Sequence, residues 1–334
     1  MKLPSNGLQG LMDQAGDLAP VRVAVVDAAQ GLVIQTLRQA HDRGIVEPRL
    51  IGDPKAITDL CKDLGWKIKE HWIVPTANDS LAAASAVKLV RDGAADAVMK
   101  GNIHTDVLMR ALLDKERGVR LAGRQVSHVF VTEVPNHPKL LGITDAAINI
   151  APDLDTKAQI LRNAVELYHL LGVELPKVAV LSAVETVNSA IVSTLDAACL
   201  TLMARRGQIG RAQVDGPLAF DNAISAAAAK EKGITSEVAG DADIVLVPDL
   251  VSGNILAKNL EYLAGAVAAG IVVGLRVPVA LSSRADPPAA RLAGLALASL
   301  MHHRSATFPA KAPAIEASLH CAPQTAQACC PLPG

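Results

Sequence analysis

Apolar runs that alternate with amphipathic stretches constrain the fold of this chain more than any other feature. The stretch "VRVAVVD" (21–27) has the unbroken apolar character of a buried strand, and "QGLVIQTLRQAHDRG" (30–44) has helical periodicity and ends at a glycine. Strand-like "PRLIGD" (48–53) and "DAVMKG" (96–101) are each followed by a further amphipathic stretch. Strands that alternate with helices predict an α/β fold with a parallel sheet.

The pattern changes between residues 118 and 152. "GRQVSHVFVTEVP" and "KLLGITDAAINIAPD" are two extended segments with no helix between them, which predicts an antiparallel pair. The alternation then resumes, with expected helices at 155–171, 190–206, 218–231, 254–269 and 287–303, and expected strands at 177–182, 243–248 and 278–282. We therefore expect one α/β domain over 1–148 and a second over 149–286, with the helix 287–303 returning to the first.

The last segment, 304–334, loses all periodicity and is rich in Ala and Pro. This composition predicts a disordered tail.

Composition excludes several classes of protein. With 50% hydrophobic and 2% aromatic residues, the core must be aliphatic, as in parallel sheets covered by helices. The net charge of −1 lacks the basic excess of a nucleic-acid-binding protein, and charged residues or prolines interrupt every long apolar span. The N-terminus has no signal-peptide core, and the five cysteines have neither disulfide-framework nor zinc spacing. We expect a cytoplasmic, soluble protein without a metal, a membrane or a nucleic-acid partner.

Common catalytic motifs are absent from the sequence. It contains no G-x-x-x-x-G-K-[ST], no G-x-G-x-x-G after a strand and no G-x-S-x-G. A P-loop, a standard dinucleotide site and an α/β-hydrolase nucleophile are therefore not indicated.

Polar residues instead follow predicted strands at four places, where open α/β sheets bind their ligands. In "MKGNIHTDVLMRALL" (99–113), Gly101 follows a strand and Thr105 lies where a helix begins. Helix N-termini offer free N–H groups to anions, although capping alone also explains this pattern. In "VDGPLAFDNAIS" (214–225), Asp215 to Pro217 are expected to form a turn before a helix that contains Asp221 and Asn222.

The third place is "VLVPDLVSGNILAKNL" (245–260). Asp249 ends a strand, Gly253 and Asn254 are expected to start a helix, and Lys258 follows one turn later on the same side. Gly253 would let a backbone approach a ligand closely, although an ordinary helix start has the same pattern.

The fourth place is "PVALSSRADPPAARLAGLALASL" (278–300), where Ser283, Arg284 and Asp286 lie between a strand and a helix. Pro287 suits a first helical turn and Asp286 its N-cap. Arginine forks onto carboxylate or phosphate oxygens, so this loop predicts an anion site. Separately, Ser127 and His128 lie in a strand-like run. We expect His128 to be a core or edge histidine with satisfied hydrogen bonds, and Ser127 to face the opposite side.

Taken together, several runs carry a family resemblance over about residues 20–300. They are "LIGD", "MKGNIHTDVLMRALL", "SHVFVTEVP", "ITDAAINIAPDLDTKAQILRNAV", "PKVAVLSAVETVN", "DGPLAFDNAIS", "VPDLVSGNILAKNL" and "LSSRAD". In this order they resemble the phosphate acetyltransferase/phosphate butyryltransferase family, and "SHVFVTEVP" and "LAFDNAIS" look closer to its butyryltransferase-like branch. The resemblance implies reversible acyl transfer between coenzyme A (CoA) and phosphate. It also implies two α/β domains around a cleft, as in isocitrate and isopropylmalate dehydrogenases, in a homo-oligomer.

The resemblance also implies roles for residues. Ser283 and Arg284 match a Ser-Arg pair that meets the thioester and the phosphate, with a nearby Asp as base. Acyl-CoA and phosphate are substrates, and neither a metal nor a further cofactor is implied. In the acetyltransferases the catalytic Asp stands a few residues further on, so Asp286 is either the base or only a helix cap. Either Arg124 or Arg120 is a candidate for a second phosphate-binding arginine.

We predict that phosphate and CoA are bound by a set of residues from these segments: Gly101, Thr105, Arg124, Ser127, Asp249, Gly253, Asn254 and Lys258. Two alternatives stay open: a metal- or NAD-dependent dehydrogenase of the same fold, and a non-catalytic domain that senses CoA or a metabolite. Retention of four residues together argues against the sensing domain: Ser283, Arg284, Asn254 and Lys258. The sequence leaves the choice between acetyl and butyryl groups open.

Overall fold

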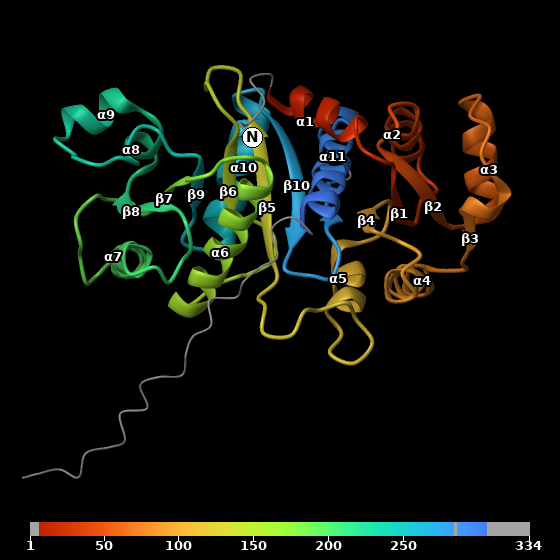
Figure 1. The fold of residues 1–334 in the computed structure, drawn as a ribbon, viewed down its shortest axis with the longest axis horizontal. Helices are drawn as coiled ribbons and strands as arrows, with labels where there is room; N and C mark the ends of the chain where they lie inside the picture. Colours follow the sequence, from red (N-terminus) through yellow and green to blue (C-terminus); the bar gives the residue numbers. More distant parts are fainter. Residues whose placement is uncertain (1–6, 284–285, 306–334) are drawn as a thin grey trace, which may run out of the picture.

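A computed structural model describes residues 7–283 and 286–305. The described residues form one mixed sheet in the order β3-β2-β1-β4-β11-β10-β5-β6-β9-β7-β8 (Figure 1). The strands are β1 (Val21–Val26), β2 (Val46–Gly52), β3 (Ile73–Pro75), β4 (Ala97–Lys100), β5 (Ser127–Glu133), β6 (Leu141–Thr144), β7 (Lys177–Leu181), β8 (Gln213–Leu218), β9 (Ile244–Leu246), β10 (Val267–Val273) and β11 (Val279–Ala280). The predicted α/β class is confirmed.

Helices connect and cover these strands. They are α1 (Gly7–Gly16), α2 (Gly31–Asp42), α3 (Pro54–Asp63), α4 (Asp79–Arg91), α5 (Thr105–Leu113), α6 (Leu154–Leu170), α7 (Val192–Arg205), α8 (Phe220–Ile224), α9 (Ala226–Glu231), α10 (Leu250–Leu263), α11 (Pro288–Ser305) and the short 3₁₀ helix η1 (Glu70–Trp72). In the part of the chain that the structure describes, no helix is long and apolar enough to cross a membrane.

The middle of the sheet reverses direction. The strands β3, β2, β1, β4 and β11 pair in parallel, and so do β6, β9, β7 and β8. Between these groups, β11 with β10, β10 with β5 and β5 with β6 pair antiparallel, which confirms the predicted antiparallel pair. As a consequence, the carboxyl ends of β4 and β11 lie at one edge of the sheet, and those of β6 and β9 lie at the opposite edge.

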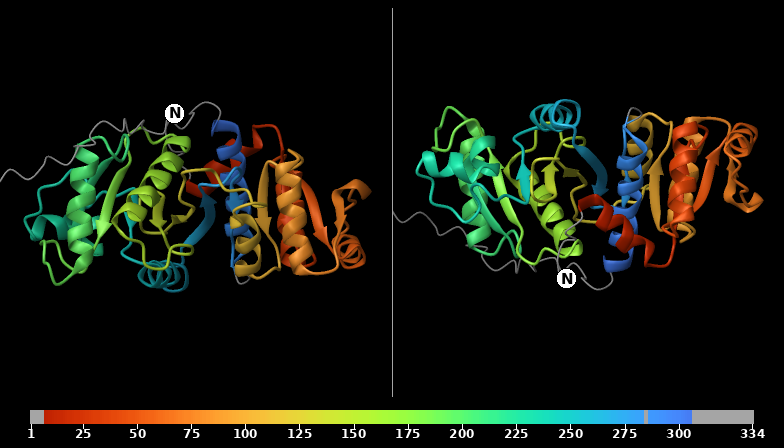
Figure 2. Two further views of the ribbon diagram at one scale, coloured as in Figure 1. Left: turned by 90° about the horizontal axis from the view of Figure 1, so that it is seen from below. Right: turned by 90° about the horizontal axis from the view of Figure 1, so that it is seen from above.

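The two faces of the central strands are covered by different helices. On one face, Leu292, Leu295 and other residues of α11 pack in one core with Ala269 and Ile271 of β10. On the other face, Ala257 of α10 packs in a separate core that includes Ala268. Figure 2 shows α10 projecting from the sheet, and in this helix only Gly253 and Ala257 are buried.

Several boundaries differ from those predicted. The expected helix 254–269 is wrong at both ends, because α10 starts at Leu250 and ends at Leu263, and β10 follows it. The expected turn at Asp215–Pro217 is also wrong, since these residues lie in β8. Because β8 is the outermost strand, its proline costs no central ladder bond.

The expected helix 218–231 is two short helices, α8 and α9, and the sequence did not predict α1. Within α8, Asp221 pairs with Lys232 at 3.3 Å and Asn222 donates to Glu185 at 3.4 Å, so both make local contacts.

The proposed division into two domains stays a prediction, because one continuous sheet runs through both halves. The last helix, α11, contacts α1, α2 and β4 from the first half and α6, β10 and β11 from the second. The predicted disordered tail lies outside the described residues from position 306 onward.

Candidate active site

Three polar segments meet where the parallel and antiparallel parts of the sheet join. In the β4–β11 pairing Val279 lies opposite Val98 and Ala280 opposite Met99, so the residues that follow β11 and those that follow β4 leave the sheet at the same edge. In the β1–β4 pairing Val26 lies opposite Lys100, which brings Asp27 to the same edge. Ligands of open α/β sheets bind at such a reversal of strand order. The segment 281–287 that leads from β11 to α11 is termed the β11–α11 loop.

Asp286 binds back onto this loop. Its carboxylate is buried, with the residue only 4% exposed, and Oδ2 accepts a hydrogen bond from the backbone N–H of Ser283 at 2.6 Å. Its Oδ1 lies 3.8 Å from Nζ of Lys258. Among the described hydrogen bonds none runs from the first turn of α11 to this carboxylate, so Asp286 anchors Ser283 rather than capping the helix. Arg284, the predicted phosphate ligand, lies outside the described residues.

Arg291 supports the same loop from within α11. Its guanidinium is buried and donates from Nε to the backbone carbonyl of Asp286 at 3.2 Å, and from Nη2 to that of Ser283 at 3.0 Å. Burial lowers the pKa of Arg291, and the charge of Asp286 acts in the opposite direction. Sequence reasoning missed this residue, although an arginine inside the apolar run "AARLAGLALA" was a visible signal.

Lys258 joins α10 to this loop. Its Nζ lies 2.6 Å from Oε2 of Glu261 and 5.7 Å from the ring centroid of Tyr262. Burial lowers the pKa of Lys258, but the hydrogen bond and charge of Glu261, together with the charge of Asp286, outweigh it and raise the pKa overall. The predicted Lys258 is therefore a charged group beside the loop.

Gly101 permits a close backbone contact at the same edge. A Cβ atom on Gly101 would lie 2.2 Å from the carbonyl oxygen of Asp27, and the next amide, of Asn102, donates to that oxygen at 2.8 Å. Burial, followed by the charge of Asp79, raises the pKa of Asp27. Thr105 is the first residue of α5 and is exposed.

Arg124 and Ser127 lie away from this cluster. The guanidinium of Arg124 forms an ion pair with Glu166 and donates to Asn163 at 3.0 Å, and Ser127 Oγ accepts from the Asn163 side chain at 2.9 Å. Both partners belong to α6, on the face of β5 that packs against α11. The described contacts of Arg124 and Ser127 thus run to α6, and the predicted ligand roles of these two residues stay predictions.

His128 points to the opposite face of β5 from Ser127, as predicted. Its ring is fully buried, lies 4.4 Å from the Phe130 ring, and has no hydrogen-bond partner among the described residues. Burial lowers the pKa of His128 to about 3, so the ring is neutral at physiological pH. The expected core or edge position is a core position, but the expectation that the hydrogen bonds of His128 are satisfied is wrong, because neither ring nitrogen has a partner among the described residues.

Asp249, Gly253 and Asn254 lie at the far end of α10. Asp249 is the N-cap and accepts from the backbone N–H of Ser252 at 2.8 Å. Gly253 packs closely, because a Cβ atom there would lie 2.7 Å from Cγ2 of Val247, and Asn254 is exposed. At a rise of 1.5 Å per residue, Asp249 lies about 13 Å along the helix axis from Lys258.

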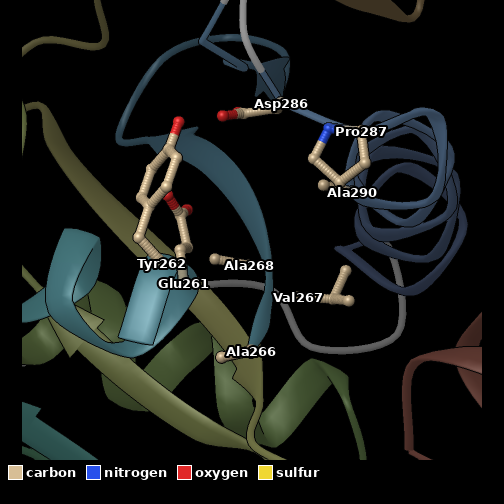
Figure 3. Close-up of a pocket in the computed structure, with 8 residues that line it drawn as sticks. All are labelled: Glu261, Tyr262, Ala266, Val267, Ala268, Asp286, Pro287 and Ala290. Carbon is tan, nitrogen blue, oxygen red and sulfur yellow. The ribbon is translucent and has the colours of Figure 1, made fainter. Parts of the chain in front are cut away.

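A pocket of about 140 Å³ adjoins the β11–α11 loop (Figure 3). It lies between the last turn of α10, the start of β10 and the start of α11. Asp286, Glu261 and Tyr262 stand at it with small apolar residues between them. Among the described residues, no group of three or more His, Cys, Asp or Glu side chains is arranged to hold a metal ion.

The fold and this cluster define an α/β protein with a candidate ligand site at the reversal point of its sheet. Residues 73–297 match the family model described as "Phosphate acetyl/butaryl transferase". Phosphate acetyltransferase of Rickettsia felis is 47% identical over 296 residues, covering 88% of this chain and 84% of that protein. Phosphate butyryltransferase of Clostridium acetobutylicum is 43% identical over 280 residues, covering 84% and 93%.

A solved structure agrees with these relatives. The crystal structure of a branched-chain phosphotransacylase from Enterococcus faecalis V583 is 31% identical, with a TM-score of 0.72 over 85% of this chain and 99% of that one. The chain therefore belongs to the phosphate acetyl/butyryl transferase family, as its sequence motifs predicted. Relatives named for acetyl and for butyryl groups match almost equally well, so similarity alone does not identify the acyl group.

Proposed function

We propose that this chain catalyses the reversible reaction of an acyl-CoA with phosphate to give an acyl phosphate and CoA. The observation that carries the proposal is the position of the family's "SSRAD" motif. Ser283 and Asp286 follow β11 at the reversal of the sheet and are joined by a hydrogen bond, and Asp286 lies beside Lys258 and lines a pocket.

The transfer needs no covalent enzyme intermediate. In the direction of acyl-CoA synthesis, the CoA sulfur attacks the carbonyl carbon of the acyl phosphate, and the carbon–oxygen bond to phosphate breaks. A free thiol has a pKa of about 8.5, so a carboxylate that accepts its proton would promote the attack. We assign this role to Asp286, whose side chain lines the pocket while its Oδ2 accepts from the backbone N–H of Ser283.

Three further groups would stabilise the charge that develops. The Ser283 hydroxyl would donate to the thioester oxygen, a role typically worth about 10²–10³ in rate. Arg284 would bind the phosphate oxygens in bidentate fashion, as the family resemblance implies. Lys258, held by Glu261 and close to Asp286, would add positive charge for the phosphate.

The positions of the other predicted ligands limit which of them we propose to contact phosphate. Gly101 and Thr105 follow β4, whose carboxyl end lies at the same edge of the sheet as that of β11, so they remain candidate phosphate ligands. Asp249, Gly253 and Asn254 lie at the N-terminal end of α10, away from the β11–α11 loop, and would contact only parts of CoA that are distant from the thioester. We further propose two α/β domains around a cleft, a homo-oligomer and a cytoplasmic location.

Product analysis tests this function. The purified protein is incubated with butyryl-CoA or acetyl-CoA and with increasing phosphate, and free thiol and acyl phosphate are measured. Equal amounts of both products, saturating with phosphate, are expected. Thiol release that ignores phosphate would identify a thioester hydrolase instead, and no release would favour the sensing domain.

A further inference from the structure

Lys100, the last residue of β4, is a buried cation that the mechanism proposed above does not use. The residue is only 3% exposed, and lysine is almost never buried to this degree unless its charge is paired. Because side chains alternate along a strand, Lys100 lies on the same face as Val98, which belongs to the core that α4 and α5 cover. Packing alone would favour an apolar residue at this position, since removing an ammonium group from water is costly.

The ammonium group of Lys100 extends towards the carboxyl end of β4. Its Nζ donates to the carbonyl oxygen of Gly101, the first residue after the strand, at 3.5 Å. The residues that follow β4 leave the sheet at the same edge as those that follow the neighbouring strand β11. The positive charge of Lys100 therefore lies at the edge of the sheet at which the β11–α11 loop carries Ser283 and Asp286.

Asp27 supplies a negative charge at the same edge. It follows β1, in which Val26 pairs with Lys100. Burial and then the charge of Asp79 raise the pKa of Asp27, whereas a hydrogen bond from Asn102 and the charge of Lys100 act to lower this pKa. Of the residues that the structure describes, Asp27 is the one non-glycine residue with a left-handed backbone, at φ 56°. Residues held in this conformation cluster at functional sites.

A buried ammonium group at this edge suits a ligand that carries more than one negative charge. Lysine presents a compact positive charge with three donors and commonly binds phosphate. A phosphate group carries a charge of about −1.5 to −2 at pH 7. In the sheet, β11 lies between β4 and β10, so Lys100 of the first half and Lys258 of the second flank the β11–α11 loop.

We propose that Lys100 is a further residue of the reaction, which binds the phosphate oxygens from the β4 side, and that Asp27 is a positioning residue that holds its ammonium group at this edge. The proposal rests on the proposed acyltransferase function. When the CoA sulfur attacks the acyl phosphate, the carbon–oxygen bond breaks and its electron pair goes to the phosphate oxygen. Lys100 then offsets the charge that the departing phosphate gains.

The test removes the charge of Lys100 and keeps the shape of its side chain. Lys100→Met should fold, because an apolar side chain of similar volume often replaces a buried charge without loss of stability, and Asp27 is only half-buried. Lys100→Gln is a second variant, and one folded variant is sufficient. Lys88→Met is the matched control, since the Lys88 side chain on α4 is 76% exposed. Thiol release gives kcat and the KM values for phosphate and butyryl-CoA, and Tm is measured in inorganic phosphate and in sodium chloride of equal ionic strength.

A folded Lys100 variant should raise KM for phosphate by about tenfold or more, as expected for the loss of one hydrogen bond to a charged group, and change KM for butyryl-CoA by less than about twofold. Phosphate should raise the Tm of the wild type and of Lys88→Met more than that of the Lys100 variant. Asp27→Asn keeps a side chain that tolerates the left-handed conformation, and should raise KM for phosphate by about threefold with kcat unchanged.

An unchanged KM for phosphate in a folded Lys100 variant would overturn the proposal while the transferase function stands. An equal rise in both KM values, or loss of folding in both Lys100 variants, would identify a purely structural role and overturn it as well. An Asp27→Asn enzyme with the wild-type KM for phosphate would exclude the positioning role of Asp27. If the wild type gives no phosphate-dependent thiol release, the proposed function itself is wrong, and the Tm comparison then decides whether Lys100 binds phosphate.

Discussion

Replacing the Asp286 carboxylate separates its structural role from its chemical one. In Asp286→Ala the N–H of Ser283 loses a charge-assisted acceptor at 2.6 Å, which costs about 1.5–3 kcal/mol of unfolding free energy. The ion pair with Lys258, which is about one-third exposed, adds less than about 1 kcal/mol. Asp286→Asn keeps an oxygen acceptor for Ser283, so we expect it to lose only about 1 kcal/mol.

The kinetic effects of the two variants should instead be similar. Neither an amide nor a methyl group can take the thiol proton, so kcat should fall by about 10²–10⁴ in both. Stability is measured by urea unfolding, and kcat by thiol release at saturating phosphate. Asp106→Asn is the control, because that side chain is 70% exposed, and it should change neither quantity. An Asp286→Asn enzyme with nearly wild-type kcat would refute the assignment of Asp286 as base and leave it a positioning residue.

Three further predictions concern the surroundings of the site. Because the pKa of His128 is about 3 in the fold and near 6.5 in the unfolded chain, the unfolded chain binds a proton first and stability falls as the pH drops from 6.5 towards 3. Between pH 7.5 and 5.0, urea unfolding of His128→Phe should therefore lose about 2 kcal/mol less than the wild type, and an equal loss would contradict this. Gly101→Ala should lower the free energy of unfolding by about 2–3 kcal/mol, because the added Cβ would meet the Asp27 carbonyl. The control Gly31→Ala has open space around it and should not lower Tm. Equal Tm values for the two variants would contradict the contact at Gly101. Arg291→Met should lower kcat about tenfold, because the carbonyls of Ser283 and Asp286 lose their donor. Arg291→Lys should recover part of the lost kcat. A Met variant with wild-type kcat would argue against a positioning role for Arg291.

Local sequence patterns predicted the parts of the fold that depend on neighbouring residues. The strand at 21–26 and the helix at 31–42 follow directly from apolar runs and helical periodicity. The strand at 267–273 did not, because "AVAAGIVVG" is small and apolar at nearly every position and shows neither a period of 2 nor one of 3.6. The predicted helix 254–269 therefore ran into the first three residues of this strand, and no strand was predicted for the rest.

The site was predictable only in part, because it depends on strand order. The "SSRAD" residues, Gly101 and Lys258 were singled out from polar residues at strand or helix ends, and the structure brings Ser283, Asp286 and Lys258 together. Asp249 was expected at the same edge of the sheet. Because β10 and β5 pair antiparallel, the strands of the second half run in the opposite direction, and Asp249, which follows β9, lies at the opposite edge. Such a reversal is a long-range property that no local pattern records.

The central claim is that this chain transfers acyl groups between CoA and phosphate through the β11–α11 loop. The most direct test is thiol release from acetyl-CoA and butyryl-CoA, with and without phosphate, by the wild type, Arg284→Ala and the control Arg110→Ala, whose side chain is 80% exposed. We predict phosphate-dependent release that falls by about 10²–10³ in Arg284→Ala and is unchanged in Arg110→Ala. Release that is independent of phosphate, or equal in the wild type and Arg284→Ala, would contradict the account.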